Sequence, residues 1–206
     1  MTIIMLVRHG NNNFLGKRLA GRLPDVHLNE EGKQQALDVA RHLTQYPIKA
    51  IFSSPLERAV ETAQPFAEMS KLPVQIEPDL LELDFGDFQG CEIKYLEQQE
   101  MWNLYRSQPT RAFFPGAVEK IAEAQSRVAN CISRIAAQYD SDDRVVCFTH
   151  GDVVRLSTAH FLNMNLDSYV RFRTHPGSIT EFRITPERIM VTHFNQIIEH
   201  TLSEGD

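Results

Sequence analysis

The chain has 206 residues, of which 42% are hydrophobic and 23% charged, with only 10 glycines and 10 prolines. This composition is close to that of average globular proteins and excludes collagen-like, coiled-coil and disordered chains. The formal net charge is −6 and no run of lysines and arginines occurs, so we expect no nucleic-acid partner. A chain of this length buries about 70% of its unfolded surface, which favours a single domain over residues 1–206.

Targeting signals and disulfides are not expected either. No apolar run approaches the ~20 residues of a membrane-spanning helix, so we expect no membrane association. Residues 1–8 contain neither a basic leader nor a cleavage site. Cys91, Cys131 and Cys147 are widely spaced and form no CxxC pair, which disfavours a disulfide framework and a structural zinc site. We therefore expect a cytoplasmic protein with reduced cysteines.

The first two elements are predicted to be a strand and a helix. Residues 3–7 are continuously apolar and predict a strand that ends at Arg8-His9-Gly10. Asn29 is a suitable N-cap for a helix that runs to Tyr46. The apolar side chains of that helix share one face at helical spacing: Ala36, Leu37, Ala40 and Leu43.

Residues 48–52 predict the second strand, and Ser54-Pro55-Leu56-Glu57 follows it. This tetrapeptide combines a capping box with a proline at the first helical position, so we expect a helix to begin there. Arg58 then lies in the first turn, where a cation is unfavourable for the helix dipole. A bound anion would offset that cost, whereas the ordinary alternative is an arginine that is solvated or paired locally.

The second half of the chain continues this alternation after an irregular stretch, residues 87–118, in which residues 92–106 could be helical. Alternating strands and helices favour a three-layer α/β/α sandwich around a mostly parallel sheet. The later predicted elements are a helix at 118–139, a strand at 144–148, a helix at 152–162, and two strands at 178–184 and 188–194 joined by Thr185-Pro186-Glu187.

Three of the predicted strands lead into residues that could bind or react with a ligand. The strand at 3–7 is followed by Arg8-His9-Gly10, the strand at 48–52 by Ser53-Ser54 and then Arg58, and the strand at 144–148 by Thr149-His150-Gly151. Ligands of open α/β sheets bind beyond the carboxyl ends of the strands, so these residues are predicted to converge. Arginine forks match phosphate oxygens and histidine can act as a nucleophile, which indicates a phosphoryl ligand. On this pattern alone, histidines that pack and arginines that are solvated explain the residues about equally well.

Five sequence blocks, in order, resemble the motifs of the histidine phosphatase superfamily, the phosphoglycerate mutase-like group. The resemblance extends from end to end and implies a phosphoglycerate mutase-like fold, phosphatase activity, and neither a metal nor another cofactor. The blocks are LVRHG at 6–10, LAGR at 19–22 with LNEEGKQQA at 28–36, SSPLERA at 53–59 with ETA at 61–63, LELDFGDFQG at 81–90, and THG at 149–151.

The resemblance also implies roles for individual residues. His9 would attack phosphorus and become a phosphohistidine, while Arg8, Arg58 and His150 would bind the phosphoryl oxygens. Glu82 would protonate the leaving alcohol and then activate water. Without the resemblance, Glu82 would count as one of several solvated loop acids.

The loop after the first strand departs from the family pattern. The family commonly has Glu-Thr after the RHG tripeptide, whereas here Asn11, Asn12 and Asn13 follow. Asparagines can donate to phosphate oxygens, but a polar turn is an equally good interpretation. These three residues are weak candidates for the substrate pocket, as are Gly21, Arg22 and Gly151.

Residues 91–118 are predicted to form a lid over the site. Within it, Trp102 and Tyr105 stand at helical spacing, which favours packing over substrate recognition by roughly three to one. Arg106 and Arg111 are candidates for binding a second anionic group of the substrate.

The expected function is that of a metal-independent phosphatase for a small phosphorylated metabolite. The chain is short for the related mutases, which makes a phosphomutase of the phosphoglycerate type the second choice, and a non-catalytic protein that binds a phosphorylated ligand the third. A metal site made by His9, His150 and Glu82 is disfavoured because Arg8 and Arg58 would repel a cation. A homodimer is possible on this sequence.

Overall fold

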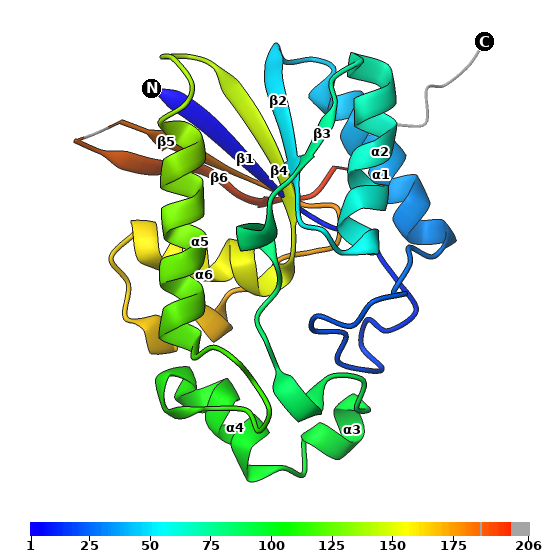
Figure 1. Ribbon diagram of the computed structural model, residues 1–206, viewed down its shortest axis with the longest axis vertical. Coiled ribbons are helices and arrows are strands. Elements are labelled where there is room, and N and C mark those ends of the chain that lie inside the picture. The colour runs from blue at the N-terminus through cyan, green and yellow to red at the C-terminus, as the bar shows by residue number, and fades with distance from the viewer. Residues whose placement is uncertain (186, 199–206) are drawn as a thin grey trace.

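A six-stranded sheet forms the centre of the computed structural model, which describes residues 1–185 and 187–198 (Figure 1). Its strands lie in the order β3-β2-β4-β1-β5-β6. Strands β1 to β4 are mutually parallel, and β5 and β6 add an antiparallel edge. The predicted mostly parallel sheet is thus confirmed. The strands span Thr2–Arg8 (β1), Ile48–Ser53 (β2), Val74–Ile76 (β3), Arg144–Thr149 (β4), Ile179–Ile184 (β5) and Ile189–Gln196 (β6).

Helices cover both faces of this sheet, which confirms the three-layer prediction (Figure 1). Helices α1 (Glu30–Leu43) and α2 (Glu57–Ser70) pack on one face, and α5 (Ile121–Ala136) and α6 (Gly151–Phe161) on the other. Because both faces of β1 are covered, its side chains are apolar on both sides, as buried parallel strands require. Ile4 and Leu6 join the α5 side of the core, and Met5 and Val7 join the α1 side.

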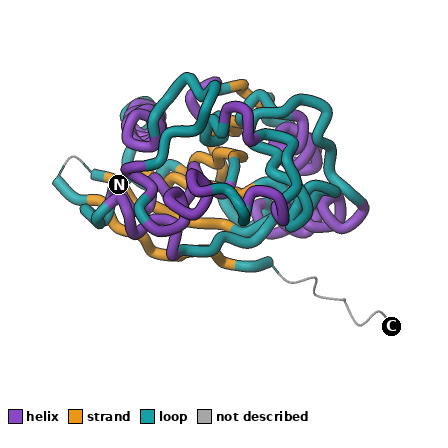
Figure 2. Tube along the Cα trace, turned by 90° about the horizontal axis from the view of Figure 1, so that it is seen from below, coloured by secondary structure: helices purple, strands orange, loops and turns teal. Residues whose placement is uncertain are grey.

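The segment 91–118 lies at one end of the molecule, beyond the carboxyl ends of the parallel strands (Figures 1 and 2). The helix that could span 92–106 is divided into α3 (Ile93–Leu96) and α4 (Glu100–Ser107). Trp102 and Tyr105 are buried in a third apolar cluster, so the packing interpretation of this pair is confirmed. The described residues also contain four short 3-10 helices: η1 (Pro78–Leu80), η2 (Gly86–Phe88), η3 (Pro109–Arg111) and η4 (Leu166–Arg171).

The start of α2 differs from its prediction. Leu56 is the N-cap and no side chain caps the helix, so the expected capping box from Ser54 to Glu57 is wrong. The hydroxyl of Ser54 lies instead 2.7 Å from Nε2 of His150. Arg58 still occupies the first turn, because the helix begins at Glu57.

The other boundaries agree with the predictions to within a few residues. Asn29 caps α1 as expected, with its Oδ1 accepting from the Gly32 amide at 2.8 Å. Helix α1 ends three residues before Tyr46, and α5 is shorter than 118–139 at both ends. Pro186 of the predicted turn lies outside the described residues. No helix in the described ranges combines the length and apolar character that crossing a membrane requires.

Candidate active site

His9 follows β1 directly and is buried beyond the end of that strand. Its Nδ1 lies 2.8 Å from the carbonyl oxygen of Gly10, and Nε2 lies 3.3 Å from Nε of Arg58. A carbonyl oxygen only accepts and an arginine Nε only donates, so Nδ1 carries the proton and the lone pair of Nε2 accepts from Arg58. Burial, with Arg58 and Arg8 nearby, holds the pKa of His9 well below its usual value. The imidazole is therefore neutral at neutral pH, and its unprotonated Nε2 is chemically able to act as a nucleophile.

Arg58 is 1% exposed and projects from the first turn of α2 toward His9. Its Nη2 donates to the carbonyl oxygen of Gly21 at 2.6 Å, while Nη1 is buried without a hydrogen-bond partner. Arg8, the last residue of β1, donates from Nη1 to the carbonyl oxygen of Thr174, and its Nε is also unpartnered. Burial lowers the pKa of Arg8 to about 10, so that guanidinium is still charged at neutral pH.

His150 follows β4 and is completely buried, with its ring 5.3 Å from that of His9. Its Nε2 lies 2.7 Å from the hydroxyl of Ser54, which itself accepts from the Leu56 amide. This hydroxyl can therefore donate its own proton to Nε2, which leaves the proton of the ring on Nδ1. Nδ1 has no partner, and burial holds the pKa of His150 well below its usual value.

Of the buried polar atoms that have no partner among the described residues, three belong to side chains grouped around His9: Nε of Arg8, Nη1 of Arg58 and Nδ1 of His150. Leaving a buried polar group unsatisfied costs about 1–3 kcal/mol, so such groups are rare in folded proteins. A tetrahedral anion beside His9 would accept hydrogen bonds from all three donors. The arrangement is therefore suited to binding a phosphoryl group.

Glu82 lies in the loop after η1 and is 8% exposed. Its Oε1 accepts from the Leu83 amide at 3.0 Å, and Oε2 accepts from the Asp152 amide at 3.4 Å. Burial raises the pKa of Glu82 to about 7, and the negative charge of Asp152 acts in the same direction. A carboxyl group with such a pKa can both donate and accept a proton near neutral pH.

A cavity of about 450 Å³, which has room for more than a phosphoryl group, is lined by Arg8, His9, Arg58 and Glu82, whereas His150 is not among its lining residues. Of the weaker pocket candidates, Asn12, Gly21 and Gly151 lie in its wall. The Oδ1 of Asn12 accepts from the Phe14 and Leu15 amides, so this side chain also forms the polar turn.

The other three weak candidates do not line this cavity, and their role in binding stays a prediction. Asn11 donates to Glu31 at 2.6 Å, and Asn13 is exposed. Arg22 donates to the carbonyl oxygen of Glu82 and forms an ion pair with Glu119.

The cavity wall contains charged residues that the sequence analysis did not select. Arg155 and Asp152, one turn apart on α6, form an ion pair at 2.5 Å, and Arg18, Arg173 and His175 also line the wall. For Asp152 and Arg155, the only signal in the sequence was that they come shortly after the Thr149-His150-Gly151 block. Of the two lid arginines, Arg106 lines a smaller cavity of about 360 Å³ that shares Arg155 with the first, and Arg111 lines neither.

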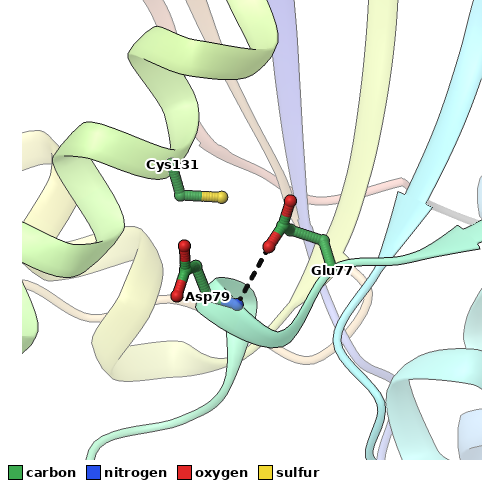
Figure 3. A group of neighbouring side chains, drawn as sticks. All are labelled: Glu77, Asp79 and Cys131. Atoms are coloured by element: carbon green, nitrogen blue, oxygen red, sulfur yellow. Dashed lines mark hydrogen bonds between the residues drawn. The ribbon is translucent and has the colours of Figure 1, made fainter.

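A second group of polar side chains, Glu77, Asp79 and Cys131, lies on the α5 side of the sheet (Figure 3). Arg134 forms ion pairs with both carboxylates, at 2.9 Å to Glu77 and 2.8 Å to Asp79. Burial raises the pKa of the Cys131 thiol to about 12, so it is protonated at neutral pH. The single positive charge of Arg134 is thus shared between the two carboxylates.

The sequence and the fold both match known proteins. The family model of the histidine phosphatase superfamily, branch 1, matches residues 4–197. Phosphoglycerate mutase-like protein 4 of Arabidopsis thaliana is 36% identical over 74% of this chain and 67% of its own. A metal-independent phosphoserine phosphatase of the same plant is 33% identical over 75% of this chain and 66% of its own. A mutant phosphoserine phosphatase of Entamoeba histolytica, in complex with phosphoserine, has a TM-score of 0.84 and 28% identity, over 95% of this chain and 97% of that one.

Proposed function

The chain belongs to the histidine phosphatase superfamily, and from this premise we propose that it hydrolyses a small phosphomonoester through a phosphohistidine on His9. The observation that carries the proposal is the group of three unpartnered buried donors around His9, whose Nε2 is unprotonated. Arg8, Arg58 and His150 bind the three non-bridging oxygens and stabilise the charge that gathers on them.

In the first step, Nε2 of His9 attacks phosphorus in line with the leaving oxygen. The N–P bond forms, the P–O bond to the alcohol breaks, and Glu82 gives its proton to the departing oxygen. When the phosphoryl group arrives, Nε of Arg58 exchanges its contact with the His9 lone pair for a phosphoryl oxygen. Arg58 therefore holds the unloaded nucleophile in place and binds the substrate afterwards.

In the second step, water attacks the phosphohistidine, and the carboxylate of Glu82 accepts a proton from it. The N–P bond breaks, which releases inorganic phosphate and regenerates both the neutral His9 and the protonated Glu82. The net reaction consumes one ester and one water, and releases one alcohol and one phosphate. All proton transfers use this chain's own residues, so the proposed reaction requires no metal ion.

The substrate is proposed to be a small phosphorylated metabolite, because the cavity has room for a phosphoryl group together with a small leaving group. Phosphoserine is the first candidate, since the similar Entamoeba structure was solved with that compound. We place the protein in the cytoplasm, in keeping with its free cysteines. The homodimer stays a proposal that size-exclusion chromatography with light scattering can test.

Phosphate release from a panel of phosphomonoesters in EDTA tests the proposal, with the wild type, His9→Ala and a control, His160→Ala. His160 is exposed on α6, so its removal should leave activity unchanged. We expect EDTA-resistant hydrolysis that His9→Ala abolishes. Activity that survives in His9→Ala would overturn the assignment of the nucleophile.

A phosphomutase remains the second candidate, because the sequence is similar to a phosphoglycerate mutase-like protein. In a mutase the phosphohistidine transfers its phosphoryl group to a second alcohol rather than to water. Wild type that releases no phosphate from any ester, but isomerises 3-phosphoglycerate when primed with a bisphosphate, would favour this alternative.

A further inference from the structure

Glu119, just after the proposed lid segment 91–118, bridges two arginines from distant parts of the chain. Its Oε1 accepts from Nη2 of Arg22 and, at 2.8 Å, from Nη2 of Arg127, while Oε2 accepts from Nε of Arg127 at 3.0 Å. The three side chains are 12%, 21% and 18% exposed, respectively. Such a bidentate and largely buried arrangement is more rigid than an ordinary surface ion pair.

Both arginines use their remaining donors on the loop that carries Glu82. Nε of Arg22 donates to the carbonyl oxygen of Glu82 itself at 2.7 Å. Nη1 of Arg127 donates to the carbonyl oxygens of Leu81 at 2.9 Å and Asp79 at 2.7 Å. Glu119 thus holds the guanidinium groups of Arg22 and Arg127, and these in turn hold the backbone on either side of the Leu81–Glu82 peptide bond.

Glu82 depends on this support, because within the described ranges its carboxylate forms no ion pair. The hydrogen bonds given for the carboxylate oxygens come from the amides of Leu83 and Asp152. The position of the carboxyl group is therefore set by the backbone of residues 81–83 together with the Asp152 amide. A movement of that backbone would move the proton that Glu82 must deliver.

The same arrangement relates the acid to the phosphate-binding groups. The carbonyl oxygen of Gly21 accepts from Nη2 of Arg58, and the next residue, Arg22, holds Glu82. Asp84 ties the acid loop to the end of the proposed lid, since its carboxylate accepts from the amides of Gly86 and Val118. One short segment, Gly21 and Arg22, therefore sets the spacing between Arg58 and Glu82.

We propose that Glu119 is a positioning residue which, through Arg22 and Arg127, holds Glu82 where it protonates the leaving oxygen. This inference rests on the proposed phosphatase function and adds three residues to it. Glu119, Arg22 and Arg127 touch neither phosphorus nor the leaving group. Their loss should therefore impair proton delivery to the leaving group more than phosphoryl binding.

The test compares two kinds of ester in Glu119→Gln. Hydrolysis of an alkyl ester such as phosphoserine needs a proton on the leaving oxygen, whereas p-nitrophenolate departs without one. A general acid contributes about 10²- to 10⁴-fold to the rate, so we expect kcat/KM for phosphoserine to fall at least about tenfold. For p-nitrophenyl phosphate we expect a change within about twofold, because the acid is dispensable there.

Glu181→Gln is the matched control. Glu181 also bridges two arginines, Arg144 at 3.1 Å and Arg183 at 3.3 Å, and its side chain is 7% exposed. It lies on β5, paired with Met5 in the middle of β1, and does not line the cavity. This variant should lose stability to a similar extent while treating both esters alike.

Hydrogen exchange gives a second readout that does not depend on turnover. We expect the amides of Leu83, Gly86 and Val118 to exchange faster in Glu119→Gln than in wild type or Glu181→Gln. Equal losses on both esters, or unchanged exchange at these amides, would overturn the positioning role while leaving the phosphatase proposal intact. Wild type that hydrolyses neither ester would instead overturn the proposed function, and with it the catalytic part of this inference.

Discussion

Nε of Arg58 donates a hydrogen bond to Nε2 of His9 over 3.3 Å, so the lone pair proposed to attack phosphorus is occupied by a phosphate-binding residue. The contact orients the imidazole and, together with the Gly10 carbonyl, selects the tautomer with its proton on Nδ1. We expect an incoming phosphoryl group to take over this donor, which would free the lone pair for attack.

The first prediction concerns Arg58→Lys. Lysine keeps the charge but loses the planar fork, and so cannot serve His9, Gly21 and a phosphoryl oxygen at once. Losing a buried, charge-assisted hydrogen bond costs about 1.5–3 kcal/mol, so we expect kcat/KM to fall on the order of 100-fold. Inorganic phosphate should also raise the melting temperature of this variant less than that of wild type, since a ligand stabilises the state that binds it.

Steady-state kinetics and thermal unfolding with and without phosphate provide these data, at constant ionic strength. Arg134→Lys is the control, because Arg134 pairs with Glu77 and Asp79 away from the cavity. An Arg58→Lys variant with wild-type kcat/KM and an undiminished phosphate shift would contradict this role for the guanidinium.

The second prediction concerns the pH dependence of hydrolysis. Burial raises the pKa of Glu82 to about 7, so the acid is mostly protonated at pH 6 and only about a tenth protonated at pH 8. For an alkyl ester, kcat/KM should therefore fall about tenfold per pH unit above pH 7. Hydrolysis of p-nitrophenyl phosphate should lack this decline, because its leaving group needs no proton.

Glu82→Gln identifies the residue responsible, because ionisation of the ester is common to both enzymes. The variant should be slow on the alkyl ester at every pH and should show no decline that is specific to that ester. If the alkyl-ester decline persists in Glu82→Gln, another group provides the proton.

The third prediction follows from the same pKa and concerns stability. The pKa of Glu82 is higher in the folded chain than its ordinary value of 4.5, so between pH 4.5 and pH 7 the folded state binds more protons than the unfolded state. The contribution of Glu82 to the free energy of unfolding is therefore fully present below pH 4.5 and is lost as the pH rises through about 7. Glu82→Gln removes the buried charge, and we expect a higher melting temperature than wild type at pH 8 and a smaller difference at pH 5.

Thermal unfolding at the two pH values measures this difference. The nearby Asp84→Asn is a suitable comparison, because the Asp84 carboxylate accepts two amide hydrogen bonds that an asparagine only partly replaces. A Glu82→Gln variant that is less stable than wild type at pH 8 would show that the carboxylate stabilises the fold.

Sequence patterns predicted most of the sheet and its helices because β1, β2, β4, α1 and α6 have complete periodic or apolar runs. Strand β3 was missed because it has only three residues, of which two are exposed. The start of α5 was placed too early because the Val118 amide donates to Asp84, a contact 34 residues away that no local pattern reveals.

The candidate site also has residues that the sequence predicted and residues whose roles depend on contacts between distant parts of the chain. The strand-end pattern and the motif resemblance both selected His9 and His150, which lie close together because parallel strands end at one edge. It could not indicate what Arg22 does, because that side chain reaches Glu82 and Glu119, 60 and 97 residues further along the chain. The hydroxyl of Ser54 was assigned to a helix cap, whereas the ring of His150 provides a partner 96 residues away.

The last prediction concerns that hydroxyl. We expect the Ser54 hydroxyl, which lies 2.7 Å from Nε2 of His150, to donate its proton there and so to keep the ring proton on Nδ1, where it is available to the proposed phosphoryl group. Ser54→Ala removes this preference and leaves Nε2 buried without a partner. Since an unsatisfied buried polar group costs about 1–3 kcal/mol, we expect roughly a tenfold loss of kcat/KM together with lower stability.

Ser53→Ala is a closely matched control for this effect. Ser53 is also completely buried, and its hydroxyl donates to the carbonyl oxygen of Ser54 rather than to a histidine. Nitrogen NMR of labelled histidine should show His150 protonated on Nδ1 in wild type and Ser53→Ala, but a mixture of tautomers in Ser54→Ala. Ser54→Thr, which retains the hydroxyl, should recover most of the activity. If the two alanine variants lose activity equally and leave the tautomer of His150 unchanged, Ser54 contributes packing alone.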